Sequence, residues 1–354
     1  MRLLIVDDSI TFRSVIKAAL SQEPGFEIVG TAANGKIALT KMKNDPVDVV
    51  ILDLEMPEMD GIETLKAMEL EKIKARVLVF ASPTSRAYEK VRQALKLGAH
   101  DVIAKPIGEN HEGSVDAAVD RVRDELLPRL RLIDSGAKLK AKIAQEAPVP
   151  AAVPSWQKRD ILKMSPDALV IASSTGGPMA LERFFEQIKR PLRVPVFIVQ
   201  HMPPPFTKNL AERIAEITGF PAKEAEHNEV AVAGHIYVAP AEFHLKLNWI
   251  NKKVQMEVYK SSRINYVIPS ADPLFQSAAD IFGPKLFAVV LTGMGEDGKR
   301  GSCAVKEKGG AVMIQDQASC VVWGMPGSVY EAGAYDKIAG IEECGQIVSN
   351  ICCL

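Results

Sequence analysis

Three residues in the second half of the chain could together hydrolyse an ester or an amide. Ser174 lies in the stretch SSTGGP, His201 in QHMPPP and Asp297 in GMGEDG. A serine alone is a poor nucleophile, but a neighbouring imidazole can accept its proton, and a carboxylate can orient that imidazole and stabilise its charged form. These residue types therefore indicate nucleophilic catalysis, provided that the fold brings them together.

Each of these residues also has an ordinary structural interpretation. The loop SSTGG lacks the G-x-S-x-G signature of hydrolases and could simply cap the helix that follows it. His201 alone could be a packed histidine, and Asp297 alone a turn residue. Ser173, His244 and Asp272 remain open as an alternative nucleophile, base and acid.

A second set of charged residues lies in the first third of the chain. Asp7, Asp8 and Asp53 follow the first and third predicted strands, and Lys105 follows the fifth. Each acid alone could be a solvated turn residue. Three carboxylates at one sheet edge repel one another unless a cation joins them, and oxygen ligands of this kind suit Mg²⁺. The pattern predicts a magnesium site.

Strict alternation of strands and helices must position this first set of acids. Apolar strands are expected at 2–6, 27–32, 47–52, 76–81 and 101–104, separated by helical segments that end with 115–127. Such alternation predicts an α/β fold with a doubly wound parallel sheet. All the strand ends that carry charge then share one edge.

The second half of the chain repeats this alternation. Buried strands are expected at 168–172, 194–199, 235–239, 286–291 and 311–315, with a further strand pair within 245–258 that turns near Asn251. Ser174, His201 and Asp297 each follow one of the apolar strands. A second doubly wound parallel sheet would bring their loops to its carboxyl edge, where open α/β sheets bind ligands.

The composition bounds the remaining possibilities. With 354 residues, two domains are expected, and a net charge of −1 gives no reason to expect nucleic acid as a partner. Acids at positions 7 and 8 speak against a signal peptide, and no apolar run is long enough for direct membrane insertion. The five cysteines lack zinc-site spacing. We expect a reduced, cytoplasmic protein.

The connection between the two halves differs in composition from both. A run of basic residues begins at Arg129, and the Pro/Ala-rich segment 144–154 follows it. We therefore expect one domain at 1–125, a linker at 126–165 and a second domain at 166–354.

The first domain resembles the receiver domain of bacterial two-component signalling, which has a flavodoxin-like fold. DLEMPEMDG places Asp53 at the phosphoacceptor position, Asp7 and Asp8 match the metal-binding acids, and Lys105 matches the invariant lysine. The resemblance implies Mg²⁺-dependent phosphoryl transfer from a histidine kinase to Asp53. One departure is Ala81 at the usual hydroxyl position, with Ser82 beside it.

The second domain resembles the Rossmann-like catalytic domain of the protein-glutamate methylesterase of bacterial chemotaxis, the CheB family. The segments IASSTGG, QHMPPPFT, LTGMGEDG and QDQASCVVWGMP carry this resemblance. It implies Ser174 as nucleophile, His201 as base, Asp297 as orienting acid and the Met294 N–H in the oxyanion hole, with no cofactor for ester hydrolysis. Glu296 and Ile268 depart from the family pattern, which could alter how substrate is held.

The two resemblances together imply a phosphorylation-activated enzyme of chemotaxis adaptation. Its substrates would be glutamyl methyl esters on the cytoplasmic domains of methylated chemoreceptors, with deamidation of receptor glutamines as a related reaction, and a chemotaxis histidine kinase would be the phosphodonor. Two alternatives are a regulator whose SSTGG loop only binds a phosphorylated ligand, and a DNA-binding response regulator. The latter needs a basic helix-turn-helix, which the sequence does not supply.

Overall fold

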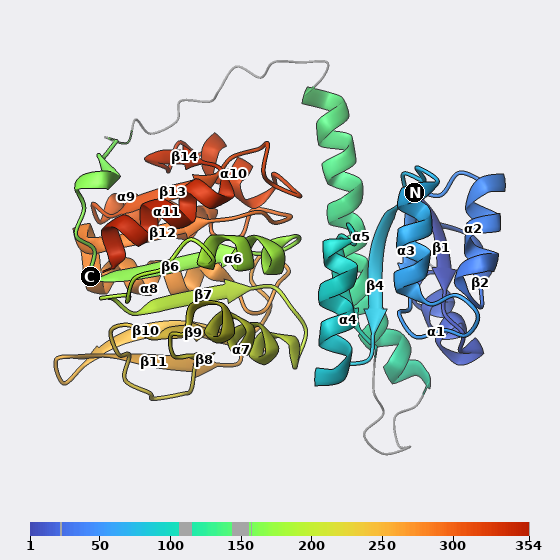
Figure 1. Cartoon of the computed structure of the whole chain (residues 1–354), viewed down its shortest axis with the longest axis horizontal. Coiled ribbons are helices and arrows are strands. Elements are labelled where there is room, and N and C mark those ends of the chain that lie inside the picture. The colour runs from blue at the N-terminus through green and yellow to red at the C-terminus, as the bar shows by residue number, and fades with distance from the viewer. Residues whose placement is uncertain (22, 106–114, 144–155, 157, 354) are drawn as a thin grey trace. The chain divides into compact units, whose positions relative to one another are not determined.

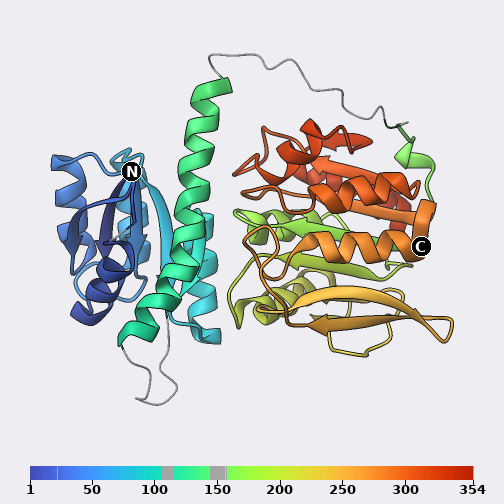
Figure 2. The same ribbon diagram turned by 180° about the vertical axis from the view of Figure 1, so that it is seen from behind.

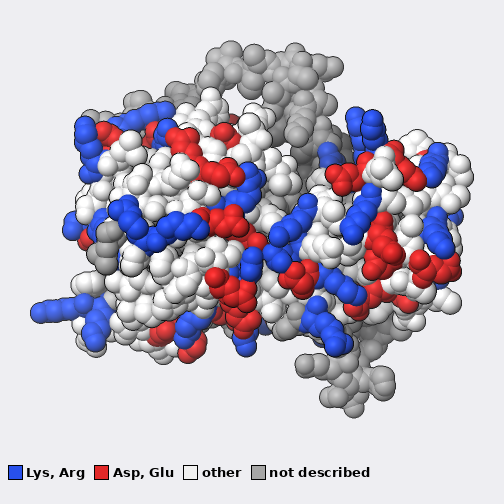
Figure 3. All heavy atoms as spheres, in the orientation of Figure 1, with Lys and Arg blue, Asp and Glu red and all other residues white. Residues whose placement is uncertain are grey.

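A computed structural model describes residues 1–21, 23–105, 115–143, 156 and 158–353 of the chain. It divides into two compact units, Met1–Leu139 and Lys140–Leu354, which are described separately. Basic and acidic side chains are interspersed on the face shown in Figure 3, in keeping with the net charge of −1. None of the helices in the described ranges has the length and apolar character needed to cross a bilayer.

The first unit is a five-stranded parallel sheet, as predicted, and its strand order is β2-β1-β3-β4-β5. In Figure 1 α3 and α4 lie in front of the sheet, and in Figure 2 α5 does, so helices cover both faces. Its elements are β1 (Arg2–Val6), α1 (Ile10–Leu20), β2 (Glu27–Ala32), α2 (Gly35–Asn44), β3 (Val49–Leu52), α3 (Gly61–Leu70), β4 (Arg76–Ala81), α4 (Ser85–Lys96), β5 (Asp101–Ala104) and α5 (Val115–Ile143).

Helix α5 is longer than the predicted segment 115–127, because it continues through Pro128 to Ile143. Proline inside a helix removes one backbone hydrogen bond. Burial of Leu126 and Leu130 offsets this loss, and Arg129 pairs with Asp101 at 3.3 Å. Residues 144–155 of the predicted linker, which include the Pro/Ala-rich segment 144–154, lie outside the described residues, and the predicted boundaries 126–165 stay a prediction.

The second unit contains a seven-stranded parallel sheet in the order β14-β13-β12-β6-β7-β9-β8. Strand β6 lies between β7 and β12, parallel to both. Its strands and helices are η1 (Ile161–Lys163), β6 (Ala168–Ser173), α6 (Gly177–Phe185), β7 (Val196–Gln200), α7 (Phe206–Thr218), β8 (Ala222–Glu224), β9 (Ile236–Val238), β10 (His244–Ile250), β11 (Lys253–Tyr259), α8 (Ala271–Phe282), η2 (Gly283–Lys285), β12 (Leu286–Val290), α9 (Lys299–Glu307), β13 (Ala311–Gln315), α10 (Met325–Glu331), β14 (Lys337–Ala339) and α11 (Ile341–Cys352).

The strand order fixes where this unit can form a site. From β6 the chain builds outward through β7, β8 and β9, and later returns to the other side of β6 with β12. A crevice at such a reversal is the usual ligand site of an open α/β sheet. The loops after β6, β7 and β12, which carry Ser174, His201 and Asp297, meet at this point.

The strand pair predicted within 245–258 forms a separate antiparallel hairpin, in which β10 pairs with β11. No element beyond Gln315 was expected from the sequence, but α10, β14 and α11 follow it. Helix α10 has seven residues and β14 has three, so neither is long enough to show a hydrophobic period.

A buried ion pair ties together α9, β13 and the segment that precedes η1 in the second unit. The side chain of Asp336, fully buried, accepts hydrogen bonds from Lys306 Nζ, from the Val312 N–H at 2.8 Å and from the Arg159 N–H at 2.7 Å. These donors come from α9, β13 and the segment that precedes η1.

Replacing Asp336 with Ala should destabilise the second unit by about 3–5 kcal/mol, because the buried charge of Lys306 would lose the carboxylate that balances it. Urea unfolding followed by tryptophan fluorescence measures this unit selectively, since Trp156, Trp249 and Trp323 all lie in it. The matched control is Asp280→Ala, which breaks the exposed pair with Lys308 and should change stability little. Equal effects of the two substitutions would contradict the prediction.

Candidate active site

The three residues predicted for ester hydrolysis lie at the carboxyl edge of the seven-stranded sheet. Backbone hydrogen bonds join their loops: the Ser174 N–H donates to the Thr292 carbonyl at 3.0 Å, and the His201 N–H donates to the Ser173 carbonyl at 3.2 Å. The side chains of Ser174, His201 and Asp297 are all buried, with at most 7% of each residue exposed. The three residues are thus largely shielded from solvent.

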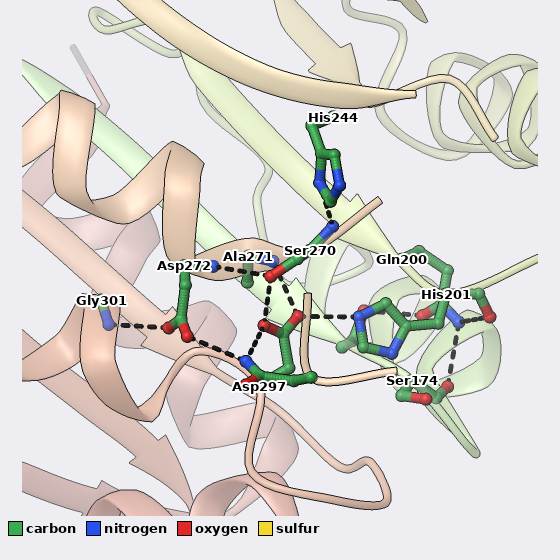
Figure 4. Close-up of polar contacts among 11 residues, drawn as sticks. Ser174, Gln200, His201, His244, Ser270, Ala271, Asp272, Asp297 and Gly301 are labelled. Atoms are coloured by element: carbon green, nitrogen blue, oxygen red, sulfur yellow. Dashed lines mark hydrogen bonds and ion pairs between the residues drawn. The ribbon is translucent and has the colours of Figure 1, made fainter. Parts of the chain in front are cut away.

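His201 and Asp297 are in direct contact. Imidazole Nε2 lies 2.9 Å from Asp297 Oδ2, and Figure 4 shows the other ring nitrogen, Nδ1, on the side of Ser174. An ionised carboxylate can only accept, so Nε2 carries the hydrogen. In the neutral ring Nδ1 then has a free lone pair, which can accept a proton from a hydroxyl on that side.

Asp297 is held as a carboxylate by four donors. Burial by itself would raise its pKa, but hydrogen bonds from His201, the Ala271 N–H at 2.7 Å and the Ser270 hydroxyl at 2.5 Å lower the pKa below its ordinary value. The fourth donor is the Asn265 side-chain amide, 3.0 Å from Oδ1. Both carboxylate oxygens are thereby occupied, and the group stays charged.

Gln200 fixes the loops that carry the serine and the histidine. Its Nε2 donates to the Ser174 carbonyl at 2.9 Å and to the His201 carbonyl at 3.1 Å (Figure 4), and its Oε1 accepts from the Ser173 hydroxyl at 2.7 Å. Sequence reasoning missed this residue, although an amide at the end of an apolar strand is a signal. A Cβ on Gly177 would lie only 2.0 Å from Oε1 of the same side chain, so position 177 requires glycine.

The alternative residues have other partners. The Ser173 hydroxyl is fully buried and donates to Gln200. His244 accepts from the Ser270 N–H with Nδ1 and donates to the Ser262 carbonyl with Nε2, and burial lowers its pKa. Asp272 accepts from the Gly301 N–H at 2.7 Å and from Asn265. These contacts favour Ser174, His201 and Asp297 over their alternatives.

The backbone at Met294 is shaped by close packing. A Cβ on the preceding Gly293 would lie 2.3 Å from Met325 Sδ and 2.8 Å from Ser174 Cβ. The Gly293 carbonyl accepts from the Met325 N–H, whereas the Met294 N–H donates to no acceptor within the described residues. A buried N–H of this kind beside Ser174 can receive a developing oxyanion.

The two residues that depart from the family pattern, Glu296 and Ile268, lie outside the contacts among Ser174, His201 and Asp297. Glu296 is largely exposed and pairs with Lys299 at 3.2 Å, and Ile268 is half-buried. Neither Glu296 nor Ile268 forms a hydrogen bond or ion pair with Ser174, His201 or Asp297, so the contacts among these three do not depend on them.

The first unit has its own charged site at the carboxyl edge of its sheet. Carboxylate oxygens of Asp7, Asp8 and Asp53 lie within 4.8 Å of one another. Lys105 Nζ is 2.9 Å from Asp7 Oδ2 and 2.7 Å from Asp53 Oδ2. Three hard oxygen ligands with only one lysine to balance them fit a divalent cation such as Mg²⁺.

Two buried members of this site, Asp53 and Lys105, have shifted pKa values. Burial raises the pKa of Asp53, against the lowering effect of Lys105. For Lys105 burial alone would lower the pKa, but Asp53 and Asp7 raise it above its ordinary value. Ala81 offers no hydroxyl at the end of β4. It is buried, and its carbonyl accepts from the Lys105 N–H at 2.8 Å, while Ser82 next to it is half-buried.

Comparisons with known proteins find relatives of both units. Residues 169–348 match the family model "CheB methylesterase" and residues 3–112 match "Response regulator receiver domain". The protein-glutamate methylesterase/protein-glutamine glutaminase of Trichodesmium erythraeum is 37% identical, covering 98% of this chain and 97% of that protein. An enzyme of the same name, numbered 2, from Caulobacter vibrioides is 38% identical over 99% of this chain and 98% of its own length.

A solved structure extends this likeness to the fold. The crystal structure of the Thermotoga maritima CheB methylesterase catalytic domain is 41% identical and covers 52% of this chain and 98% of its own, with a TM-score of 0.51. The chain therefore belongs to the CheB methylesterase family, with a response regulator receiver domain ahead of its catalytic domain.

Proposed function

We propose that this chain is a cytoplasmic, phosphorylation-activated protein-glutamate methylesterase and protein-glutamine glutaminase. Its substrates are glutamyl methyl esters and particular glutamines on the cytoplasmic domains of chemoreceptors, and its phosphodonor is a chemotaxis histidine kinase. The names of the full-length relatives support this activity. The observation that carries it in this chain is the His201–Asp297 contact beside Ser174.

In the proposed hydrolysis the Ser174 hydroxyl attacks the ester carbonyl while His201 Nδ1 accepts its proton. Asp297 stabilises the resulting imidazolium through the Nε2 hydrogen bond, and the Met294 N–H binds the oxyanion. The tetrahedral species collapses to an acyl-enzyme as His201 returns the proton to the departing methanol. Water then attacks by the same route and releases glutamate. An amide passes through the same species and releases ammonia.

In the receiver domain the Asp53 carboxylate is the phosphoryl acceptor. Asp7, Asp8 and Asp53 would hold Mg²⁺, which when bound supplies positive charge against the incoming phosphoryl oxygens. Lys105, already between Asp7 and Asp53, adds a second positive charge at the acceptor. Phosphorylation places new charge and acceptor oxygens at this edge, which is the change that would raise esterase activity.

Replacing Ser174 with Ala should lower methanol release from methylated receptor by several orders of magnitude, because the nucleophile is lost. The comparison variant is Ser173→Ala, which removes only the hydrogen bond to Gln200 and should keep most of the activity. Both should still be phosphorylated at Asp53. Near-normal hydrolysis by the Ser174 variant would refute the assignment.

Asp297→Asn should lower kcat about 10³- to 10⁴-fold, because an amide cannot hold His201 in the same tautomer and charge state. The exposed Asp280→Asn serves as the control.

The pKa of Asp297 in the wild type is lowered on folding, so its charge stabilises the fold above the unfolded pKa. That stabilisation should be lost as the pH falls through the folded pKa, and the melting temperatures of wild type and Asp297→Asn should converge in acid. A constant difference would contradict this assignment of charge.

Acetyl phosphate with Mg²⁺ should label the wild type at Asp53 and accelerate methanol release, whereas Asp53→Asn should show neither effect. Excess EDTA should block labelling, since three carboxylates and an incoming phosphate otherwise repel. Phosphate incorporation and methanol are measured on the same samples. Equal labelling with and without the chelator would argue against a metal at this site.

A further inference from the structure

One side chain joins the carboxylate of the proposed triad to a second buried carboxylate. Asn265 Nδ2 lies 3.0 Å from Asp297 Oδ1 and 2.9 Å from Asp272 Oδ2. A side-chain amide nitrogen has two hydrogens, so this geometry uses both, one on each carboxylate. The two acids lie side by side in Figure 4, at the start of α8 and in the loop after β12.

We propose that Asn265 is a positioning residue that holds Asp297 in the orientation needed by His201 and bridges it to Asp272. This inference rests on the proposed Ser-His-Asp mechanism. Asn265 and the Ser270 hydroxyl both donate to Oδ1, while the His201 ring and the Ala271 N–H engage Oδ2. The donors on Oδ1 prevent the carboxylate from rotating about its own axis, so Oδ2 stays directed at the imidazole.

The bridge also offsets repulsion between two like charges. Burial and the neighbouring Asp297 raise the pKa of Asp272, against the lowering effects of the Gly301 N–H, Asn265 and the more distant Arg300. The other titratable groups near Asp297 are His201 and His244, from the β7 and β10 sides. Without the amide between them, both carboxylates lose a donor that favours their charged forms.

The backbone at this position suits asparagine. Asn265 has φ 52°, in the left-handed region that asparagine and glycine enter at least cost. Asn265→Gly therefore removes the side chain but keeps this conformation accessible. Asn251 in the β10–β11 hairpin has φ 50°, is exposed, and contacts neither carboxylate, so Asn251→Gly is a matched control.

The test measures methanol release from methylated receptor by the full-length protein across pH. In Asn265→Gly we expect kcat to fall about tenfold with KM nearly unchanged, the usual size of effect for a lost hydrogen bond to a charged group. The low-pH edge of the kcat profile should move to higher pH. Adding Asp272→Asn should move that edge back, because the like charge is gone. Asn251→Gly should match the wild type.

A purely structural role would lower kcat without moving the pH profile, and that outcome, or an unchanged kcat, would overturn the proposal. Carboxyl ¹³C NMR titration of Asp272 and Asp297 provides a readout that needs no substrate. Both resonances should titrate at higher pH in Asn265→Gly, and unchanged titrations would also refute the bridge. If the wild type releases no methanol, the proposed function fails, whereas the NMR titration still decides the role of Asn265.

Discussion

The catalytic unit depends on keeping one carboxylate charged where almost no water reaches it. Removing a carboxylate from water costs several kcal/mol unless other groups replace its hydration. For Asp297, hydrogen bonds replace this hydration. They come from His201 and Asn265, from the Ser270 hydroxyl at the N-cap of α8 and from the N–H of Ala271, the first residue of that helix. The amino-terminal end of a helix also favours negative charge. The start of α8 therefore supplies part of the polar environment that keeps Asp297 charged.

In the receiver site the negative charges outnumber the groups that stabilise them. Three carboxylates face a single lysine, and burial raises the pKa of Asp53 where hydrogen bonding lowers that of Asp297. Both carboxylate oxygens of Asp297 accept hydrogen bonds, whereas the receiver site has excess negative charge that favours a cation. Charged residues at the carboxyl edge of a parallel sheet thus form both the proposed hydrolytic site and the proposed phosphoryl acceptor site.

Sequence reasoning predicted the features that depend on chain order. Ser174, His201 and Asp297 were predicted because each follows an apolar strand, and the sheet brings their loops together. It did not find Asn265, Ser270 or Gln200 as parts of the site, because their roles depend on contacts made only after folding. Asn265, for example, lies 32 residues from Asp297 along the chain. Short elements such as β8 and β14 were also not predicted, because a strand of three residues is too short to show a hydrophobic period.

The single amide of Gln200 has a consequence for anyone who wishes to redesign this enzyme. Its three hydrogen bonds tie the nucleophile loop to the histidine loop, and its Oε1 occupies the space that a Cβ at Gly177 would take. Positions 177 and 200 therefore constrain each other, and a library that varies one alone will mostly yield disrupted loops. Directed evolution of substrate range should hold this pair constant and draw its diversity from the exposed rim around Glu296.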